Sequence, residues 1–135
     1  LSPVLFGPPK SVLFGASKKQ LRLALNKFNE LIKDYPTSDK IDDAAYMCGK
    51  IHEYHKDYSI AVLYYKRTFQ WNPDTSYAAR YKAARLLDYQ LRERDEALRL
   101  YRESLQKETA YQNYRDEIQL RIDALTAEAE NVRID

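Results

Sequence analysis

The chain has 135 residues, enough for one domain with a modest core, and 44% of them are hydrophobic, which is typical of a folded protein. Its 22 lysines and arginines nearly balance its 20 aspartates and glutamates, so the net charge is only +2. This balance counts against a nucleic-acid-binding module, because such modules usually carry a clear basic excess. The single cysteine excludes an internal disulfide. No apolar run reaches the ~18 residues that a membrane span needs.

Residues 1–16 differ in character from the rest of the chain. They contain the sequence VLFG twice, with two prolines between the copies. Because proline interrupts a helix, we expect an N-terminal arm here, either extended or a short broken helix. Ser17 and Gln20 form a capping box, which predicts that the first regular helix begins at Ser17. This helix is expected to end near Pro36.

Helical periodicity and turn signals predict five further helices along the chain. They are expected to begin near positions 39, 57, 75, 95 and 110. A second capping box, Thr109 to Gln112, precedes the last of them. Tyr114, Ile118, Ile122 and Leu125 are expected to form one stripe on this helix. No segment shows strand alternation, so the predicted fold class is all-α.

Two sequence patterns repeat along these helices. The segments 46–54 and 81–89 share the order Tyr, small, basic, acidic, Tyr, and they lie 35 positions apart. An alanine also stands one helical turn before an aromatic residue at three places, namely Ala24 and Phe28, Ala61 and Tyr65, and Ala97 and Tyr101. Pro36 and Pro73 close the first two of these helices.

These patterns resemble the tetratricopeptide repeat, a helix–turn–helix unit of ~34 residues. The resemblance implies a right-handed α-solenoid of such units with a C-terminal capping helix. It divides the chain into an N-terminal arm (1–16), repeats (17–109, with a half unit at 17–36 and full units at 38–73 and 74–109) and a capping helix (110–135).

In that family, a small residue near the middle of the first helix lets the second helix approach. Gly49 holds this place, as does Ala84 if the next unit has one extra loop residue; the other register would put Arg85 there. The chain departs from the family at Ala45, where an early tryptophan is expected, and at His52 or Leu87, where an aromatic residue is expected. Trp71 is predicted to cap the joint with the next unit.

The family resemblance also implies a binding site, since ligand-facing positions of the first helices line the concave side of such a solenoid. These positions correspond to Tyr46, Lys50, Glu53, Tyr54, Tyr81, Arg85, Asp88 and Tyr89. Within each helix they share one face. Lys50 and Arg85 would offer donors to a peptide backbone or a carboxylate, between walls of tyrosine. The alternative is internal pairing, of Lys50 with Glu53 or of Glu53 with an arginine of the next unit.

No residue pattern predicts catalysis, a metal or a cofactor. His52 and His55 lack the further ligands that a metal site requires, so we interpret His52 as a core or boundary residue. Cys48 is expected to be a buried apolar thiol. The acidic pairs Asp42-Asp43 and Asp116-Glu117 stand in first helical turns, where they complement the helix dipole.

The expected function is a non-catalytic protein–protein interaction module, or scaffold, that binds a partner peptide or helix on the concave face. One alternative is a structural oligomerisation unit without an external ligand, which would self-associate through the N-terminal arm or the last helix. A third hypothesis, a single-stranded nucleic-acid binder, uses tyrosine stacking in segment 57–73. On a helix, however, Lys66 and Arg67 fall off the aromatic stripe of that segment, so nucleic acid is not expected.

The linker at 35–38 and the slightly long units resemble bacterial envelope-associated members of the family. Examples are the outer-membrane assembly lipoprotein of the β-barrel machinery and the periplasmic partner of the Tol–Pal system. This resemblance implies a periplasmic or cell-envelope location, with the cytoplasm as the alternative.

Overall fold

A computed structural model of the chain describes residues 10–109 and 112–134. Over these residues the protein is all-α, as predicted, and contains no strand. The helices are α1 (Lys10–Asp34), α2 (Ile41–Tyr54), α3 (Tyr58–Trp71), α4 (Ala79–Tyr89), α5 (Arg94–Lys107), the 3-10 helix η1 (Gln112–Tyr114) and α6 (Arg115–Ile134). Within the same ranges, no helix combines the length and apolar character that crossing a membrane would require.

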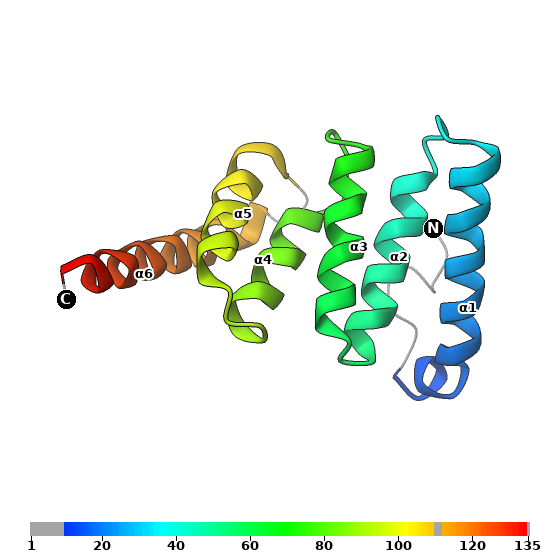
Figure 1. Cartoon of the computed structure of the whole chain (residues 1–135), viewed down its shortest axis with the longest axis horizontal. Helices are drawn as coiled ribbons and strands as arrows, with labels where there is room; N and C mark the ends of the chain where they lie inside the picture. The colour runs from blue at the N-terminus through cyan, green and yellow to red at the C-terminus, as the bar shows by residue number, and fades with distance from the viewer. Residues whose placement is uncertain (1–9, 110–111, 135) are drawn as a thin grey trace.

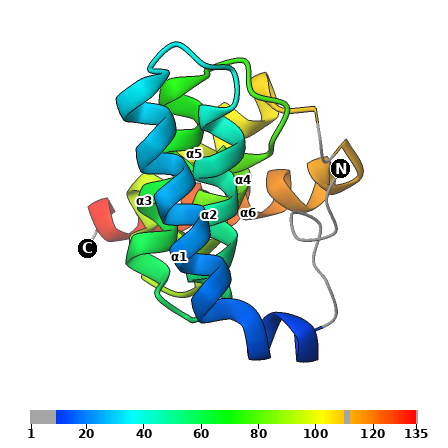
Figure 2. The same cartoon turned by 90° about the vertical axis from the view of Figure 1, so that its right-hand side faces the viewer.

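The helices pack mainly against their neighbours in the sequence. Contacts join α1 to α2, α2 to α3, α3 to α4, α4 to α5 and α5 to α6. Figure 1 shows α1 to α5 side by side in a row, from blue at one end to yellow near the other. Helix α6 runs crosswise to these helices and carries the C-terminus away from the row (Figures 1 and 2).

Helix α1 begins at Lys10 rather than at Ser17. The capping box predicted at Ser17 is therefore wrong as a helix start, and the second VLFG copy is part of the helix. Lys10 directly follows the two prolines, and proline favours a position at or just before a helix N-terminus. The first turns of α1 bend away from the axis of the remainder (Figure 2). The rest of the expected arm, residues 1–9, lies outside the described residues.

The core forms two clusters that follow the row of helices. The first joins α1 to α2 and contains Ala24, Phe28, Leu31, Ile41, Ala44, Ala45, Cys48 and Ile51. The second extends from α2 to α6 and includes the fully buried rings of Tyr65 and Tyr101. Ile118, Ile122 and Leu125 of α6 are buried in it, which confirms their predicted stripe. Tyr114 does not belong to that stripe, because it lies in η1 and is partly exposed.

The α3–α4 connection forms hydrogen bonds with the first turn of α2. Asp42 accepts hydrogen bonds from the Thr75 hydroxyl at 2.7 Å and from the Asn72 amide at 3.2 Å. Asp43 accepts one from the Tyr77 hydroxyl at 2.7 Å, and burial, together with this bond, raises the pKa of Tyr77. The acidic pair therefore links α2 to the α3–α4 connection. Its negative charge also complements the positive N-terminal end of the helix dipole.

Helix α4 begins later than predicted, at Ala79, because a distant side chain caps it. Glu108, directly after α5, accepts hydrogen bonds from the backbone N–H groups of Arg80 at 2.7 Å and Tyr81 at 3.1 Å. The buried Arg80 guanidinium also lies 3.4 Å from the Glu108 carboxylate. A carboxylate at this place satisfies two otherwise unpaired donors of the first helical turn.

Candidate functional site

The predicted close approach of two helices is confirmed at Gly49 of α2. A Cβ atom added there would lie 2.7 Å from two ring carbons of Tyr65 on α3, which is closer than packed carbon atoms come. The Tyr65 ring is fully buried, and its hydroxyl donates a hydrogen bond to Glu53 Oε1 at 2.7 Å. The missing side chain at Gly49 therefore allows α3 to settle on α2.

The same arrangement recurs between α4 and α5. The Tyr101 hydroxyl donates a hydrogen bond to Asp88 Oδ2 at 3.0 Å, as the Tyr65 hydroxyl does to Glu53. Ala84 is fully buried and Arg85 is exposed, so Ala84 and not Arg85 is the buried small residue of α4 at this level. In both helix pairs, a buried tyrosine of the second helix is tied to a carboxylate near the end of the first.

Three of the eight predicted binding residues are buried, namely Tyr46, Tyr81 and Asp88. Tyr46 stacks on Tyr77 of the α3–α4 connection, with ring centroids 4.3 Å apart. Tyr81 faces Tyr114 of η1, with centroids 6.0 Å apart. The expected walls of exposed tyrosine are therefore wrong at these two positions, because the segment that follows each helix pair covers them.

Three of the other five predicted residues line one hollow between α2, α3 and α4, whereas Lys50 and Tyr54 are not part of its lining. Glu53, Arg85 and Tyr89 line a hollow of about 150 Å³, which we call the basic hollow. Its remaining lining residues are Tyr58, Lys82, Leu86 and Gln90. Tyr54 lies outside this lining and has its ring against His55. The structure thus brings together residues of α2, α3 and α4 near the C-terminal end of α2.

Positive charge accumulates beside the basic hollow. The pKa of the partly buried Lys50 ammonium is lowered, mainly by burial and further by the nearby Lys82, although Glu53 opposes the shift. Among the residues that the structure describes, neither Lys82 nor Arg85 forms an ion pair. The predicted pairing of Glu53 with an arginine of the next unit is not found there, since its hydrogen bond comes from Tyr65. An anion at this place would meet Lys82 and Arg85, with Glu53 as the carboxylate that also lines the hollow.

Helix α6 contacts the C-terminal end of α4 through Arg121. Its guanidinium forms two hydrogen bonds to the buried Asp88 carboxylate, from Nε and Nη2, each 2.8 Å long. The same group lies over the Tyr89 ring, 5.2 Å from the centroid. Asp88 is therefore engaged by Arg121 and Tyr101, and its role is to hold α6 rather than to face a ligand.

Four of the seven residues that line the basic hollow were not among the predicted binding residues, namely Tyr58, Lys82, Leu86 and Gln90. Lys82 could have been found, because positions 82, 85 and 89 share one face of a helix. Tyr58 carries no such signal. It belongs to the first turn of α3, and only the turn between α2 and α3 brings it beside α4.

The described histidine and cysteine side chains support packing rather than chemistry. His52 is buried, as expected, and its ring stacks on Tyr64 with centroids 5.4 Å apart. Cys48 is fully buried, and burial raises the pKa of its thiol to about 12, so its reactive thiolate is scarce at neutral pH. Over the described ranges, no group of three potential metal ligands occurs.

Comparison of the chain with protein-family models and with curated proteins finds no match. The family resemblance drawn from the sequence therefore remains an expectation.

Proposed function

We propose that the chain is a non-catalytic protein–protein interaction module, in which the basic hollow binds an acidic segment of a partner protein. The observation that carries this proposal is the cluster of Lys82, Arg85 and the nearby Lys50 at the ends of α2 and α4. Two of these cations have no carboxylate partner among the described residues. A partner carboxylate would supply the missing charge in a partly desolvated place, where ion pairs are strongest.

The shape of the basic hollow suits an acidic peptide segment. The Arg85 guanidinium offers a planar set of donors that a carboxylate can accept in pairs. Tyr58 and the exposed Tyr89 add flat apolar area beside these donors. An acidic residue flanked by an apolar one would therefore make both kinds of contact.

We further propose that the helices form an α-solenoid of tetratricopeptide-like units with α6 as the capping helix. Support comes from the repeated contacts, in which Gly49, Tyr65 and Glu53 have the counterparts Ala84, Tyr101 and Asp88. Packing mainly between sequence neighbours is also the hallmark of such arrays. The face that contains the basic hollow would then be the concave, ligand-binding side.

A peptide array tests the binding proposal. Short peptides of varied charge are probed with the wild-type chain and with the double variant Lys82→Glu/Arg85→Glu. We expect the wild type to select peptides with acidic residues, and we expect the double variant to lose them. The control is Lys19→Glu/Lys27→Glu on α1, which makes the same change of net charge at exposed positions away from the hollow. The same acidic peptides bound by all three proteins would refute the proposal.

Self-association is a second candidate function, and α6 favours it. Leu120 and Val132 of this helix are 69% and 73% exposed. Val132 also lines a hollow of about 190 Å³ between α5 and α6, together with Leu98 and Leu125. Exposed apolar side chains on a helix that extends beyond the row are a natural contact for a second copy.

The nucleic-acid hypothesis gains no support from segment 57–73. Lys66 forms an ion pair with Glu96 of α5, and the Arg67 guanidinium lies 5.7 Å from the centroid of the Tyr64 ring on its own helix. Tyr65 is buried. These contacts leave neither a free basic pair nor an accessible stacking ring at the centre of this segment.

A further inference from the structure

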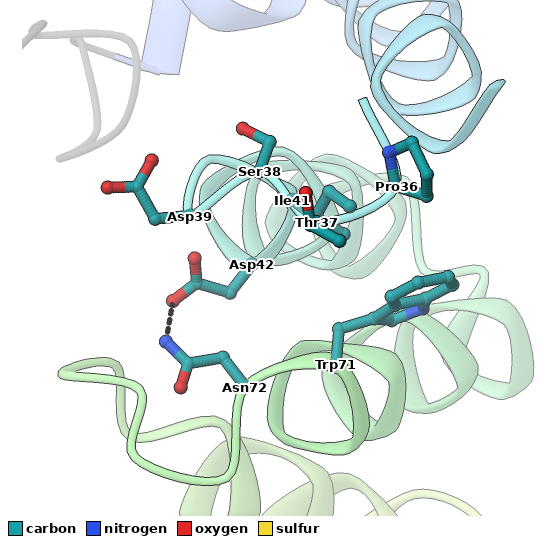
Figure 3. Close-up of a pocket in the computed structure, with 8 residues that line it drawn as sticks. All are labelled: Pro36, Thr37, Ser38, Asp39, Ile41, Asp42, Trp71 and Asn72. Carbon is teal, nitrogen blue, oxygen red and sulfur yellow. Dashed lines mark hydrogen bonds between the residues drawn. The ribbon is translucent and has the colours of Figure 1, made fainter. Parts of the chain in front are cut away.

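A second hollow lies at the opposite end of α2, around the only tryptophan of the chain. It has a volume of about 260 Å³ and is lined by the loop between α1 and α2 (Pro36, Thr37, Ser38 and Asp39), by Ile41 and Asp42, and by Trp71 and Asn72 at the end of α3. In Figure 3 the rings of Trp71 and Pro36 bound one side, and the carboxylates of Asp39 and Asp42 lie on the other. We call it the Trp71 hollow.

Trp71 does not occupy the place that the sequence predicted. Instead of capping the joint with the next helix pair, it faces back toward Pro36 in the preceding loop (Figure 3). Its side chain is 45% exposed. A large indole that stays half in water beside a hollow offers an aromatic surface to a ligand.

The charged side chains that line the Trp71 hollow are all acidic. Asp42 is buried, and its Oδ2 atom already accepts two hydrogen bonds, from Thr75 and Asn72. Asp39 is exposed and makes no ion pair within the described part of the chain. An aromatic face beside two carboxylates attracts a cation that is both flat and positively charged.

Within the described part of the chain, this kind of contact is built twice with the protein's own arginines. The Arg80 guanidinium lies 4.6 Å from the centroid of the Phe69 ring and also pairs with Glu108. The Arg121 guanidinium lies over Tyr89 and pairs with Asp88. In each case an arginine lies against an aromatic ring and binds a carboxylate. The Trp71 hollow supplies the ring and the carboxylates, but no arginine lines it.

We infer that the Trp71 hollow binds an arginine side chain of a partner protein. The guanidinium would stack on the Trp71 indole and pair with Asp39, while its methylene stem would pack on Pro36. Arginine is favoured over lysine because its planar, weakly hydrated guanidinium stacks on an indole. Asp42 and Glu53 stand near opposite ends of α2, about 16 Å apart along its axis, so this site is separate from the basic hollow.

Trp71 fluorescence tests the inference directly, because no other tryptophan contributes to the signal. The full chain is titrated with the peptide acetyl-Gly-Ser-Arg-Ser-Gly-amide and with versions that carry citrulline or lysine instead of arginine. We expect a saturable change of emission with the arginine peptide below about 10 mM, and binding several-fold weaker for both other peptides. Citrulline has the same shape without the charge, so it isolates the cationic contact.

Matched variants locate the site. Asp39→Asn should weaken binding of the arginine peptide by about three- to fivefold. Asp116→Asn, an equal change of charge at an exposed position on α6, should leave it unchanged. The inference is overturned if the arginine peptide gives no saturable change, if citrulline or lysine binds as tightly, or if Asp39→Asn has no greater effect than Asp116→Asn.

Discussion

At the residue scale, the contact between Gly49 and Tyr65 decides how closely α2 and α3 pack. Tyr65 has no room to move, because it is fully buried and its hydroxyl is bound to Glu53. A methyl group at position 49 would therefore force α2 and α3 apart or break this hydrogen bond. Intrinsic helix propensity favours the substitution instead, because alanine is better than glycine inside a helix by about 1 kcal/mol.

We expect Gly49→Ala to lower the free energy of unfolding by about 1–3 kcal/mol, as overpacked core substitutions do. Urea denaturation measures this change. In the background of Tyr65→Leu, which removes the ring, the same substitution should be neutral or stabilising. If Gly49→Ala is equally harmful in both backgrounds, the ring contact is not the cause.

Single residues also show how far sequence reasoning reaches. Gly49 and Ala84 could be predicted, because the family resemblance expects a small residue near the middle of the first helix of each unit. Tyr46 could not be recognised as buried, because its cover is Tyr77, which lies 31 positions further along the chain. Trp71 was misplaced for the same reason: the direction in which a terminal side chain turns depends on loop geometry. Local spacing gives the face of a helix but not what lies against that face.

At the scale of elements, α6 is held by one strong polar contact in addition to its apolar stripe. Arg121 binds Asp88 through two hydrogen bonds, and Asp88 is almost completely buried. Among the described residues, removing the guanidinium would leave the buried carboxylate with the Tyr101 hydroxyl as its hydrogen-bond donor. Hydrogen bonds between charged groups contribute about 1.5–3 kcal/mol, and loss of the partner of a buried charge costs at least as much.

We therefore expect Arg121→Ala to destabilise the chain by about 2–3 kcal/mol and to speed amide hydrogen exchange in α6 more than in α2 or α3. Arg102→Ala is the control, because Arg102 also joins α5 to α6, through Thr126, but is exposed. Its effect should stay within about 0.5 kcal/mol. Equal effects of the two substitutions would mean that the apolar stripe alone holds α6.

Helix boundaries show the same division between local and distant causes. The ends of α3 were predicted to within a residue, because Asp57 and the Asn72-Pro73 pair are local start and stop signals. The start of α4 was not, because its cap is Glu108, which lies 28 positions from Arg80. The predicted start of α1 was wrong because a capping box can also lie inside a helix when the residues before it are helical. Caps that come from another element leave no pattern in the sequence of the helix they serve.

At the scale of the whole molecule, two hollows of opposite charge lie at the two ends of α2. The basic hollow contains Lys82 and Arg85, whereas the Trp71 hollow contains Asp39 and Asp42. This separation fits a chain whose net charge is close to zero but whose surface is locally charged. Partner segments of opposite sign would therefore be directed to different ends of α2. The two binding proposals can fail independently of each other.

The exposed apolar side chains of α6 lead to the last prediction. Helix α6 runs crosswise to the row (Figure 1), and its Leu120 and Val132 side chains remain largely exposed. In a symmetric dimer each of these side chains would be buried twice, at about 1.5–3 kcal/mol for each. Association itself costs about 4–15 kcal/mol, so we expect a weak dimer with a dissociation constant on the order of 100 μM.

Sedimentation velocity over a range of concentrations on both sides of this value measures the dimer. Leu120→Glu/Val132→Glu should give a monomer throughout, because the carboxylates would have to lose their hydration at the contact. Leu23→Glu, at a half-exposed leucine on α1, should leave the dimer unchanged. A wild-type chain that stays monomeric would exclude self-association through α6. The chain would then act through the basic hollow or the Trp71 hollow as a single copy, because neither hollow needs residues from a second one.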